Sequence, residues 1–105
     1  IRDLVRGALV EEEWSSAKKE VIGVLVVVYD HRMRELSSRM LNVEHGHHSE
    51  IVTTLHLHLD HDTCLEAKVI RGKPAAVRHI ADKLISMKGV KYGRLIPATA
   101  GKRLR

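Results

Sequence analysis

The sequence lacks phenylalanine altogether, and its few tryptophan and tyrosine residues make up only 3% of the 105 positions. Hydrophobic residues nevertheless account for 44% of the chain, so a core would have to consist mainly of aliphatic side chains. A chain of this length can form one domain with a core of its own. Its many β-branched residues favour a sheet, and we expect a small α/β sandwich.

Cysteine and long apolar segments are equally scarce. The single cysteine excludes an internal disulfide framework and is typical of the reducing cytoplasm. No apolar run approaches the roughly 18 residues of a membrane span, and no signal-peptide pattern opens the chain. We therefore expect a cytoplasmic protein with no membrane partner.

The charge balance is basic but not decisive. Eighteen lysine and arginine residues against 13 aspartate and glutamate residues give a formal charge of +5. Such an excess can indicate nucleic-acid binding. Part of it lies in the tail residues Lys102, Arg103 and Arg105, which a solvated chain end explains equally well.

The first residues follow a helical stripe, with apolar side chains three and four positions apart at Ile1, Leu4, Val5, Ala8 and Leu9. No capping residue precedes the stripe, so we expect the end of a helix whose beginning is missing. The polar stretch from Glu11 to Lys19 predicts a linker.

The remaining residues predict an alternation of strands and helices. Residues 21–29 are apolar on both faces, which is typical of a strand buried on both sides. Alternation in residues 50–59, with Ile51 and Thr53 on one face, and a return run at 63–70 predict a hairpin. The last predicted strand, 90–96, should stop at Pro97. Helical spacing marks two further segments, one with Met33, Leu36, Met40 and Leu41 ending near Gly46, and one from Pro74 to Ile85 with Gly89 as C-cap.

This order of strand, helix, strand, strand, helix and strand predicts an α+β, ferredoxin-like fold. Its two helices would cover one face of an antiparallel sheet. The other face would be bare in a monomer, although the strand at 21–29 supplies apolar residues to it. A second copy of the same sheet is the simplest cover, so we expect a homo-oligomer.

Potential metal ligands gather in one part of the sequence. Six of the eight histidines lie between residues 45 and 61, and the only cysteine follows at 64. His56 and His58 leave the same face of a strand. If the hairpin pairs His58 with Cys64, Glu66 lies opposite His56 and all of them share that face. A shift of one residue would move Cys64 to the opposite face, and the turn alone does not decide between these registers.

Two imidazoles and a thiolate form a ligand set suited to zinc, copper or nickel. Glu66 would be a natural acceptor for a ligand's ring N–H. The loop with His45, His47 and His48 offers a further donor. Because this loop follows a helix that we place on the opposite side of the sheet from His56 and His58, we expect the donor to come from another chain.

Each of these residues also has a simpler interpretation. A histidine pair on a strand is more often a polar, half-exposed face, and a lone cysteine is more often a small buried hydrophobe. His31 and His79 are assigned to the solvated histidines. The combination of His56, His58 and Cys64 on one face favours a metal site.

The same residues resemble the nickel-responsive regulators (NikR). The resemblance covers nearly the whole chain and is carried by 54–58 (Thr-Leu-His-Leu-His), 62–66 (Asp-Thr-Cys-Leu-Glu), His45, 89–93 (Gly-Val-Lys-Tyr-Gly) and 1–4 (Ile-Arg-Asp-Leu). Members of this family join a ribbon-helix-helix DNA-binding domain to a ferredoxin-like (ACT-type) domain that forms a tetramer core. The resemblance therefore implies a cytoplasmic, non-enzymatic repressor that senses Ni(II) and binds operator DNA.

The resemblance also implies roles for particular residues. His56, His58 and Cys64 of one chain would bind nickel in a square plane with His45 of a neighbouring chain, while Glu66 and Tyr29 would surround the site. A second cation such as potassium would lie between the domains, held by the Asp3 carboxylate and the carbonyl groups of Ile85, Met87 and Val90.

The same resemblance divides the chain into the end of the ribbon-helix-helix domain (1–14), a linker (15–20) and the nickel-binding and oligomerisation domain (21–105). The strand that reads DNA would precede Ile1, so this chain alone should bind DNA poorly.

Two other functions remain alternatives at this point. A zinc- or copper-binding ferredoxin-like domain, enzymatic or metal-handling, would need an open coordination position if it were a hydrolase, and four protein ligands would leave none. An ACT-like small-molecule-binding module would explain the fold but leave the histidine and cysteine cluster without a purpose. The sequence thus favours the nickel sensor.

Overall fold

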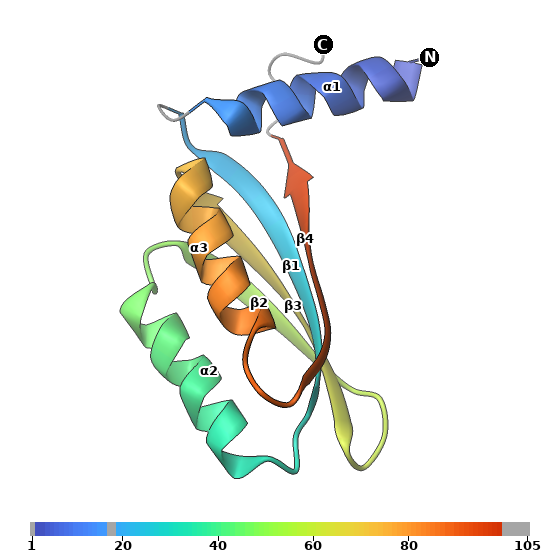
Figure 1. Cartoon of the computed structure of the whole chain (residues 1–105), viewed down its shortest axis with the longest axis vertical. Helices are drawn as coiled ribbons and strands as arrows, with labels where there is room; N and C mark the ends of the chain where they lie inside the picture. The colour runs from blue at the N-terminus through green and yellow to red at the C-terminus, as the bar shows by residue number, and fades with distance from the viewer. Residues whose placement is uncertain (1, 17–18, 100–105) are drawn as a thin grey trace.

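The computed structural model describes residues 2–16 and 19–99. The sequence predictions for Ile1 and for Lys102, Arg103 and Arg105 lie outside these residues. The described elements are α1 (Arg2–Ser15), β1 (Val21–Asp30), α2 (Arg34–Gly46), β2 (Ile51–His58), β3 (Thr63–Gly72), α3 (Pro74–Ile85) and β4 (Val90–Ala98) (Figure 1).

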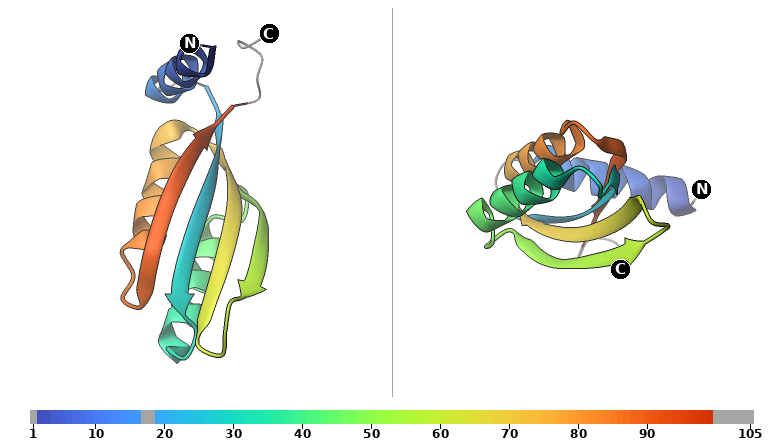
Figure 2. Two further views of the ribbon diagram at one scale, coloured as in Figure 1. Left: turned by 90° about the vertical axis from the view of Figure 1, so that its right-hand side faces the viewer. Right: turned by 90° about the horizontal axis from the view of Figure 1, so that it is seen from below.

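The four strands form one antiparallel sheet in the order β2-β3-β1-β4. Helices α2 and α3 lie on one face of this sheet, and α1 crosses its end (Figures 1 and 2). The arrangement confirms the predicted ferredoxin-like fold. No helix in the described part of the chain has the length and hydropathy needed to cross a membrane.

The core lies between the sheet and the two helices that cover it. Every second residue of β1 is buried there, and α3 contributes the predicted stripe of Val77, Ile80, Ala81 and Leu84. On α2 the buried stripe is Leu36, Met40 and Val43. Leu41, predicted to face inward, is 52% exposed because positions 36, 40 and 43 complete one helical face without it.

Helix α1 continues through the first part of the predicted linker, which corrects the prediction of a linker from Glu11. Trp14 anchors its last turn: the side chain is 2% exposed, and Nε1 donates a hydrogen bond of 3.1 Å to the carbonyl oxygen of Ala98. Gly23 leaves room for this ring, since a Cβ at Gly23 would lie 2.9 Å from it. The predicted stripe is mostly exposed, with Leu4 at 78%.

Both edge strands depart from the simple patterns. Pro97 does not stop β4 but lies within it opposite Gly23, because an edge strand tolerates a residue without an N–H group. In β2 the register shifts between Ile51 and Thr53. Ile51 therefore packs against the core opposite Ile70, on the other face from the one predicted for it.

Gly89 is not the C-cap of α3, which is Ser86. It lies in the turn before β4 with φ of 101°, a backbone conformation that favours glycine. A side chain there would also meet Met33, whose sulfur atom would be 2.6 Å from the added Cβ. The glycine thus serves the turn rather than the helix end.

The second face of the sheet is uncovered by any described element (Figure 2). The register aligns apolar side chains in rows across it, for example Leu57, Leu65, Val28 and Tyr92. Two of the side chains on this face, Leu55 and Leu57, are 73% and 55% exposed. A surface of this kind is typical of a protein–protein interface.

We therefore expect the metal-free protein to assemble as a dimer or a larger homo-oligomer through this face. Leu55→Ser should shift the assembly toward monomer, because the apolar Leu55 side chain would be buried only in the interface with a second chain. Leu41→Ser, at an exposed leucine on the outer side of α2, is the control and should leave the assembly unchanged. Sedimentation velocity at micromolar concentration measures this, and a monomeric unmodified protein would contradict the expectation.

Candidate metal centre

The β2–β3 hairpin has the register in which His58 lies opposite Cys64 and His56 opposite Glu66. The face is not the one expected. Cys64 and Glu66 are 0% and 9% exposed and lie on the buried side of β3, which the helices cover, whereas we predicted them on the opposite side from α2. The pairing with β1 explains this face. Tyr29 lies opposite Cys64 and is a core residue, so the Cys64 side chain also faces the core.

His58 and Cys64 are already close enough to share an ion. The Cys64 Sγ and His58 Nδ1 atoms are 3.3 Å apart, and the His56 and His58 rings lie 4.9 Å apart between centroids. The imidazoles extend from an edge strand and are reachable from solvent, since the His56 side chain is 44% exposed. The buried sulfur and the exposed rings together form a nitrogen and sulfur donor set that fits a borderline transition metal.

Cys64 is a poor thiolate without such an ion. Burial raises the pKa of its thiol, and the negative charge of Glu66 raises it further, against a smaller opposing effect from Tyr29. A metal ligand has to be the thiolate. A bound divalent cation next to the sulfur would stabilise the thiolate directly.

Glu66 organises the polar groups beneath His56. The Tyr29 hydroxyl donates a hydrogen bond of 2.6 Å to its Oε2 atom, and His56 Nδ1 lies 3.3 Å from the same oxygen. Burial alone would raise the pKa of Glu66, but hydrogen bonds from Lys68 and Tyr29 outweigh burial and lower it. An ionised Glu66 holds the ring proton of His56 on Nδ1 and leaves Nε2 as the donor to a metal.

Lys68 is a buried cation that was not among the residues predicted for the site. Its side chain is 0% exposed, and Nζ donates a hydrogen bond of 2.5 Å to Glu66 and another to the Glu44 carboxylate on α2. The alternation of β3 could have indicated it, because positions 64, 66 and 68 share one face. Lys68 connects the site strand with the last turn of α2.

His45 follows Glu44 on α2 and is exposed. The chain after it reaches the start of β2, where the Ile51 N–H bonds to the His47 carbonyl at 3.0 Å. His58 lies at the other end of β2, and at about 3.3 Å per residue the strand places it roughly 23 Å from Ile51. The structure therefore does not bring His45 and His58 together within one chain.

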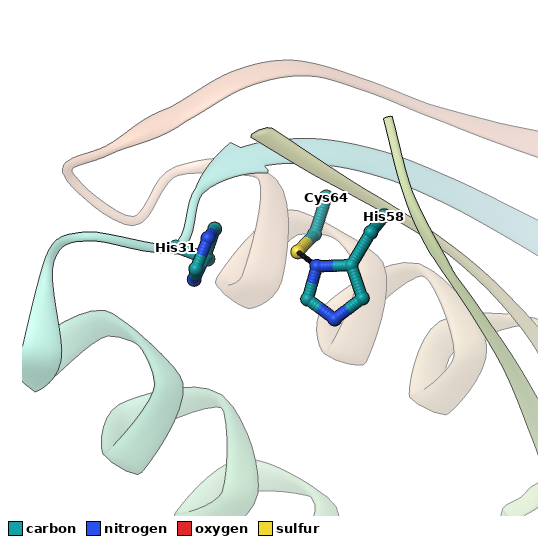
Figure 3. A group of neighbouring side chains, drawn as sticks. All are labelled: His31, His58 and Cys64. Carbon is teal, nitrogen blue, oxygen red and sulfur yellow. Dashed lines mark hydrogen bonds between the residues drawn. The ribbon is translucent and has the colours of Figure 1, made fainter. Parts of the chain in front are cut away.

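His31, which we assigned to the solvated histidines, lies at the site. Its donor atom and those of His58 and Cys64 are all within 4.8 Å of one another, with the thiol between the two rings (Figure 3). The cause is the pairing of β1 with β3, which sets Tyr29 opposite Cys64 and brings the backbone N–H of His31 to 2.9 Å from the Asp62 carbonyl. The sequence could have indicated that His31 lies near Cys64 only if the order of the strands in the sheet had been known.

The residues predicted for a second cation are not brought together within one chain. Met87 and Val90 lie near the start of β4, and the Met87 carbonyl accepts a hydrogen bond of 3.1 Å from the Val90 N–H. Asp3 lies on α1, which contacts the other end of β4 through Trp14 and Ala98. That end is roughly 26 Å from Val90 by strand length.

Comparisons with known proteins agree on one family. Residues 22–98 match the family described as the NikR C terminal nickel binding domain. The chain is 49% identical over 104 residues to a protein of Solidesulfovibrio magneticus and 48% identical over 104 residues to one of Geobacter metallireducens, each alignment covering 99% of this chain and 75% of the relative. Both relatives carry the name of a nickel-responsive regulator.

A solved structure supports the fold. An uncharacterized protein of Thermotoga maritima superposes with a TM-score of 0.69 at 13% identity, covering 77% of this chain and 100% of that one.

The buried Lys68 generates a stability prediction for the metal-free protein. Lys68→Met should lower the free energy of unfolding by about 3 to 5 kcal/mol at neutral pH, because it leaves the Glu44 and Glu66 carboxylates without their cation. Lys91→Met is the matched control at an exposed lysine and should change the value by about 0.5 kcal/mol or less. Urea unfolding monitored by circular dichroism measures both.

The pH dependence checks the cause. The pKa of Glu66 is lowered in the folded protein, so its contribution to stability is present above the unfolded pKa of about 4.3 and is lost as pH falls through the folded pKa. The deficit of Lys68→Met should therefore shrink below about pH 4. Equal midpoints for the two lysine variants at neutral pH would show that the ammonium contributes nothing.

Proposed function

The chain belongs to the family of NikR C-terminal nickel-binding domains, and on this premise we propose which of its residues hold the metal. As a member of this family the chain is a nickel-sensing regulatory domain. The observation that carries the residue assignment is the pair formed by Cys64 and His58, 3.3 Å apart, with His56 beside it.

The proposed nickel ligands are His56, His58 and Cys64 of one chain and His45 of a neighbouring chain. Glu66 supports this set because it holds Nδ1 of His56 and leaves Nε2 directed to the metal. Imidazole and thiolate donors suit nickel, and a planar set of four favours nickel or copper over zinc, which prefers a tetrahedron.

Distance along the sheet supports a cross-chain origin for the His45 donor, whereas the sequence had indicated opposite faces of the sheet as the reason. His45 and the hairpin ligands lie on the same helix-covered side, but His45 is near the start of β2 and His58 near its end. An exposed histidine at a helix end is well placed to reach another chain. A metal held in this way joins two chains, so nickel binding and assembly favour each other.

We infer that residues 1–14 are the end of a ribbon-helix-helix domain, joined by a linker at 15–20 to the nickel-binding and oligomerisation domain at 21–105. In a homotetramer, nickel would stabilise the arrangement in which the attached DNA-binding domains grip an operator. The domain would act as a repressor in the cytoplasm and carry out no catalysis, because four protein ligands leave no position for a reacting water.

A second cation such as potassium is part of the proposal only in a cross-chain form. Asp3 of one chain would have to meet the carbonyl groups of Ile85, Met87 and Val90 of another, because these groups lie at opposite ends of β4 within a chain.

The ligand assignment is tested with single substitutions. Cys64→Ala, His56→Ala and His58→Ala should each abolish stoichiometric high-affinity nickel binding, because each removes one of the donors. His79→Ala, at an exposed histidine on α3, is the control and should bind as the unmodified protein does. Equilibrium dialysis gives the stoichiometry, and visible absorption identifies the planar nickel–thiolate complex. Tight nickel binding by Cys64→Ala would refute the assignment.

The cross-chain role of His45 is tested by complementation. His45→Ala and Cys64→Ala proteins should each fail to bind nickel tightly alone, whereas a mixture with exchanged subunits should recover about half a nickel ion per dimer. The hybrid has one complete site, because one chain keeps Cys64 and its partner keeps His45. The other half of a statistical mixture consists of homodimers without a complete site.

Subunit exchange is verified with differently tagged chains. If exchange is complete and tight nickel binding stays absent, the fourth ligand is not His45 of a neighbour. If His45→Ala alone binds nickel normally, His45 is no ligand at all.

A further inference from the structure

Each chain contributes to two different nickel sites in the proposed arrangement. Its β2–β3 hairpin supplies three ligands to one site, and its His45 completes the site of a neighbour. Lys68 contacts a carboxylate beside each contribution. Its Nζ atom donates a hydrogen bond of 2.5 Å to Glu66, whose other oxygen lies 3.3 Å from His56 Nδ1. It donates a second hydrogen bond to Glu44, the residue before His45.

We propose that Lys68 is a positioning residue that couples these two nickel sites through Glu66 and Glu44. The inference rests on the proposed function, because it takes His45 to act in a neighbouring chain. It adds a path of contacts inside each protomer by which one metal site influences another. Loss of this path should change the nickel affinity of a site to which the altered chain gives only His45.

The backbone of Lys68 is fixed from both sides. It lies in β3, with Leu25 of β1 opposite it on one side and Thr54 of β2 opposite it on the other. Its side chain is fully buried, so water cannot replace a lost carboxylate at the ammonium group. A carboxylate that moved away would leave a buried charge unpaired, which is strongly unfavourable. The sheet therefore holds Glu44 in place through Lys68.

The last turn of α2 needs this contact. A helix of 13 residues is marginal by itself, and its N-cap is Met33, whose thioether is a poor acceptor for a capping hydrogen bond. Glu44 places a negative charge at the C-terminal end, where the helix dipole disfavours it, and the Lys68 ammonium offsets this charge. The Glu44 carbonyl also accepts a hydrogen bond of 3.2 Å from the His47 N–H. The position of Glu44 thus sets the turn that contains His45.

Glu66 connects the same ammonium with the hairpin. Its Oε1 atom accepts from Lys68, whereas its Oε2 atom accepts from Tyr29 at 2.6 Å and faces His56. A histidine that binds an ion through Nε2 donates from Nδ1 to such a carboxylate. A stronger bond from His56 draws the charge of Glu66 away from Lys68, and the ammonium then binds Glu44 more firmly.

The coupling therefore has a sign. Loading of a chain's own site favours the position of His45 that the neighbour's site requires, and the reverse holds by linkage. The two nickel sites joined by one Lys68 should assist each other, although no ligand is common to both.

The test uses hybrid oligomers of His45→Ala and Cys64→Ala chains, isolated through two different affinity tags. Every complete site in them has the same composition, because the His45→Ala chain supplies the hairpin ligands and the Cys64→Ala chain supplies His45. A further substitution can therefore be placed in the chain that gives only His45. Nickel affinity is measured by competition with a chelating dye.

Lys68→Met in the chain that gives His45 should weaken nickel binding by about fivefold or more, because His45 loses its fixed helix end. Glu44→Ala in that chain should act in the same direction. Alanine favours the helix, so a lower helix propensity cannot explain the loss. Glu44→Ala in the other chain should leave the affinity unchanged, since position 45 of that chain is already alanine. Lys91→Met, at an exposed lysine in the His45-giving chain, is the control.

Hydrogen exchange in the metal-free protein gives a readout that does not involve nickel. Glu44→Ala should lose amide protection in the last turn of α2 while α3 keeps its protection, because only the contact with Lys68 is removed. Protection in α2 equal to that of the unmodified protein would contradict the role of Lys68 at the helix end.

The outcomes separate the coupling from the function on which it rests. Failure of the hybrid without further substitution to bind nickel tightly contradicts the cross-chain ligand itself. Tight binding that neither Lys68→Met nor Glu44→Ala weakens in the His45-giving chain overturns the coupling, and the cross-chain ligand stands. Equal losses from Glu44→Ala in either chain also overturn it, because they indicate a general effect on the fold. If the Lys68→Met chain does not fold, the two placements of Glu44→Ala decide the question.

Discussion

The buried ammonium of Lys68 is the interaction on which the metal centre depends. It lies between the carboxylates of Glu66 and Glu44 and is shielded completely from water. With this cation in place Glu66 stays ionised beside Tyr29 and His56, although burial alone would favour its neutral form. The same cation contacts Glu44 in the last turn of α2. The orientation of His56, a proposed ligand, and the position of this helix end therefore have a common cause.

The order of the elements was predictable because each helix and strand carries its own periodicity, as in the stripe from Val77 to Leu84. In contrast, the sequence did not predict which face of the sheet carries the proposed ligands. Alternation in β3 shows that Cys64 and Glu66 share a side, but only packing against α2 and α3 determines which side is covered. The register shift at Ile51 has the same origin, since a local pattern contains no information on its partner strand.

The candidate site was predictable where its residues are neighbours in the hairpin, and His56, His58 and Cys64 belong to this part. His31 and Lys68 depend on contacts between segments distant in sequence. His31 is set by the pairing of Tyr29 with Cys64 across two strands, and Lys68 gains its second partner, Glu44, from a helix. The residues around His31 do not distinguish it from a surface histidine, and the alternation of β3 indicates only that Lys68 shares a face with Cys64 and Glu66. Their roles therefore emerge only in the assembled sheet.

The position of β2 at the edge of the sheet has a consequence for kinetics. His56 and His58 extend from a strand with a neighbour on one side only, and the His56 ring is already partly in solvent. An ion can therefore enter or leave from the rim by rotation of side chains, without local unfolding of the core around Cys64. For the proposed cross-chain site, we expect metal exchange to be set by the breaking of coordination bonds and by departure of the neighbouring chain, while the fold itself persists.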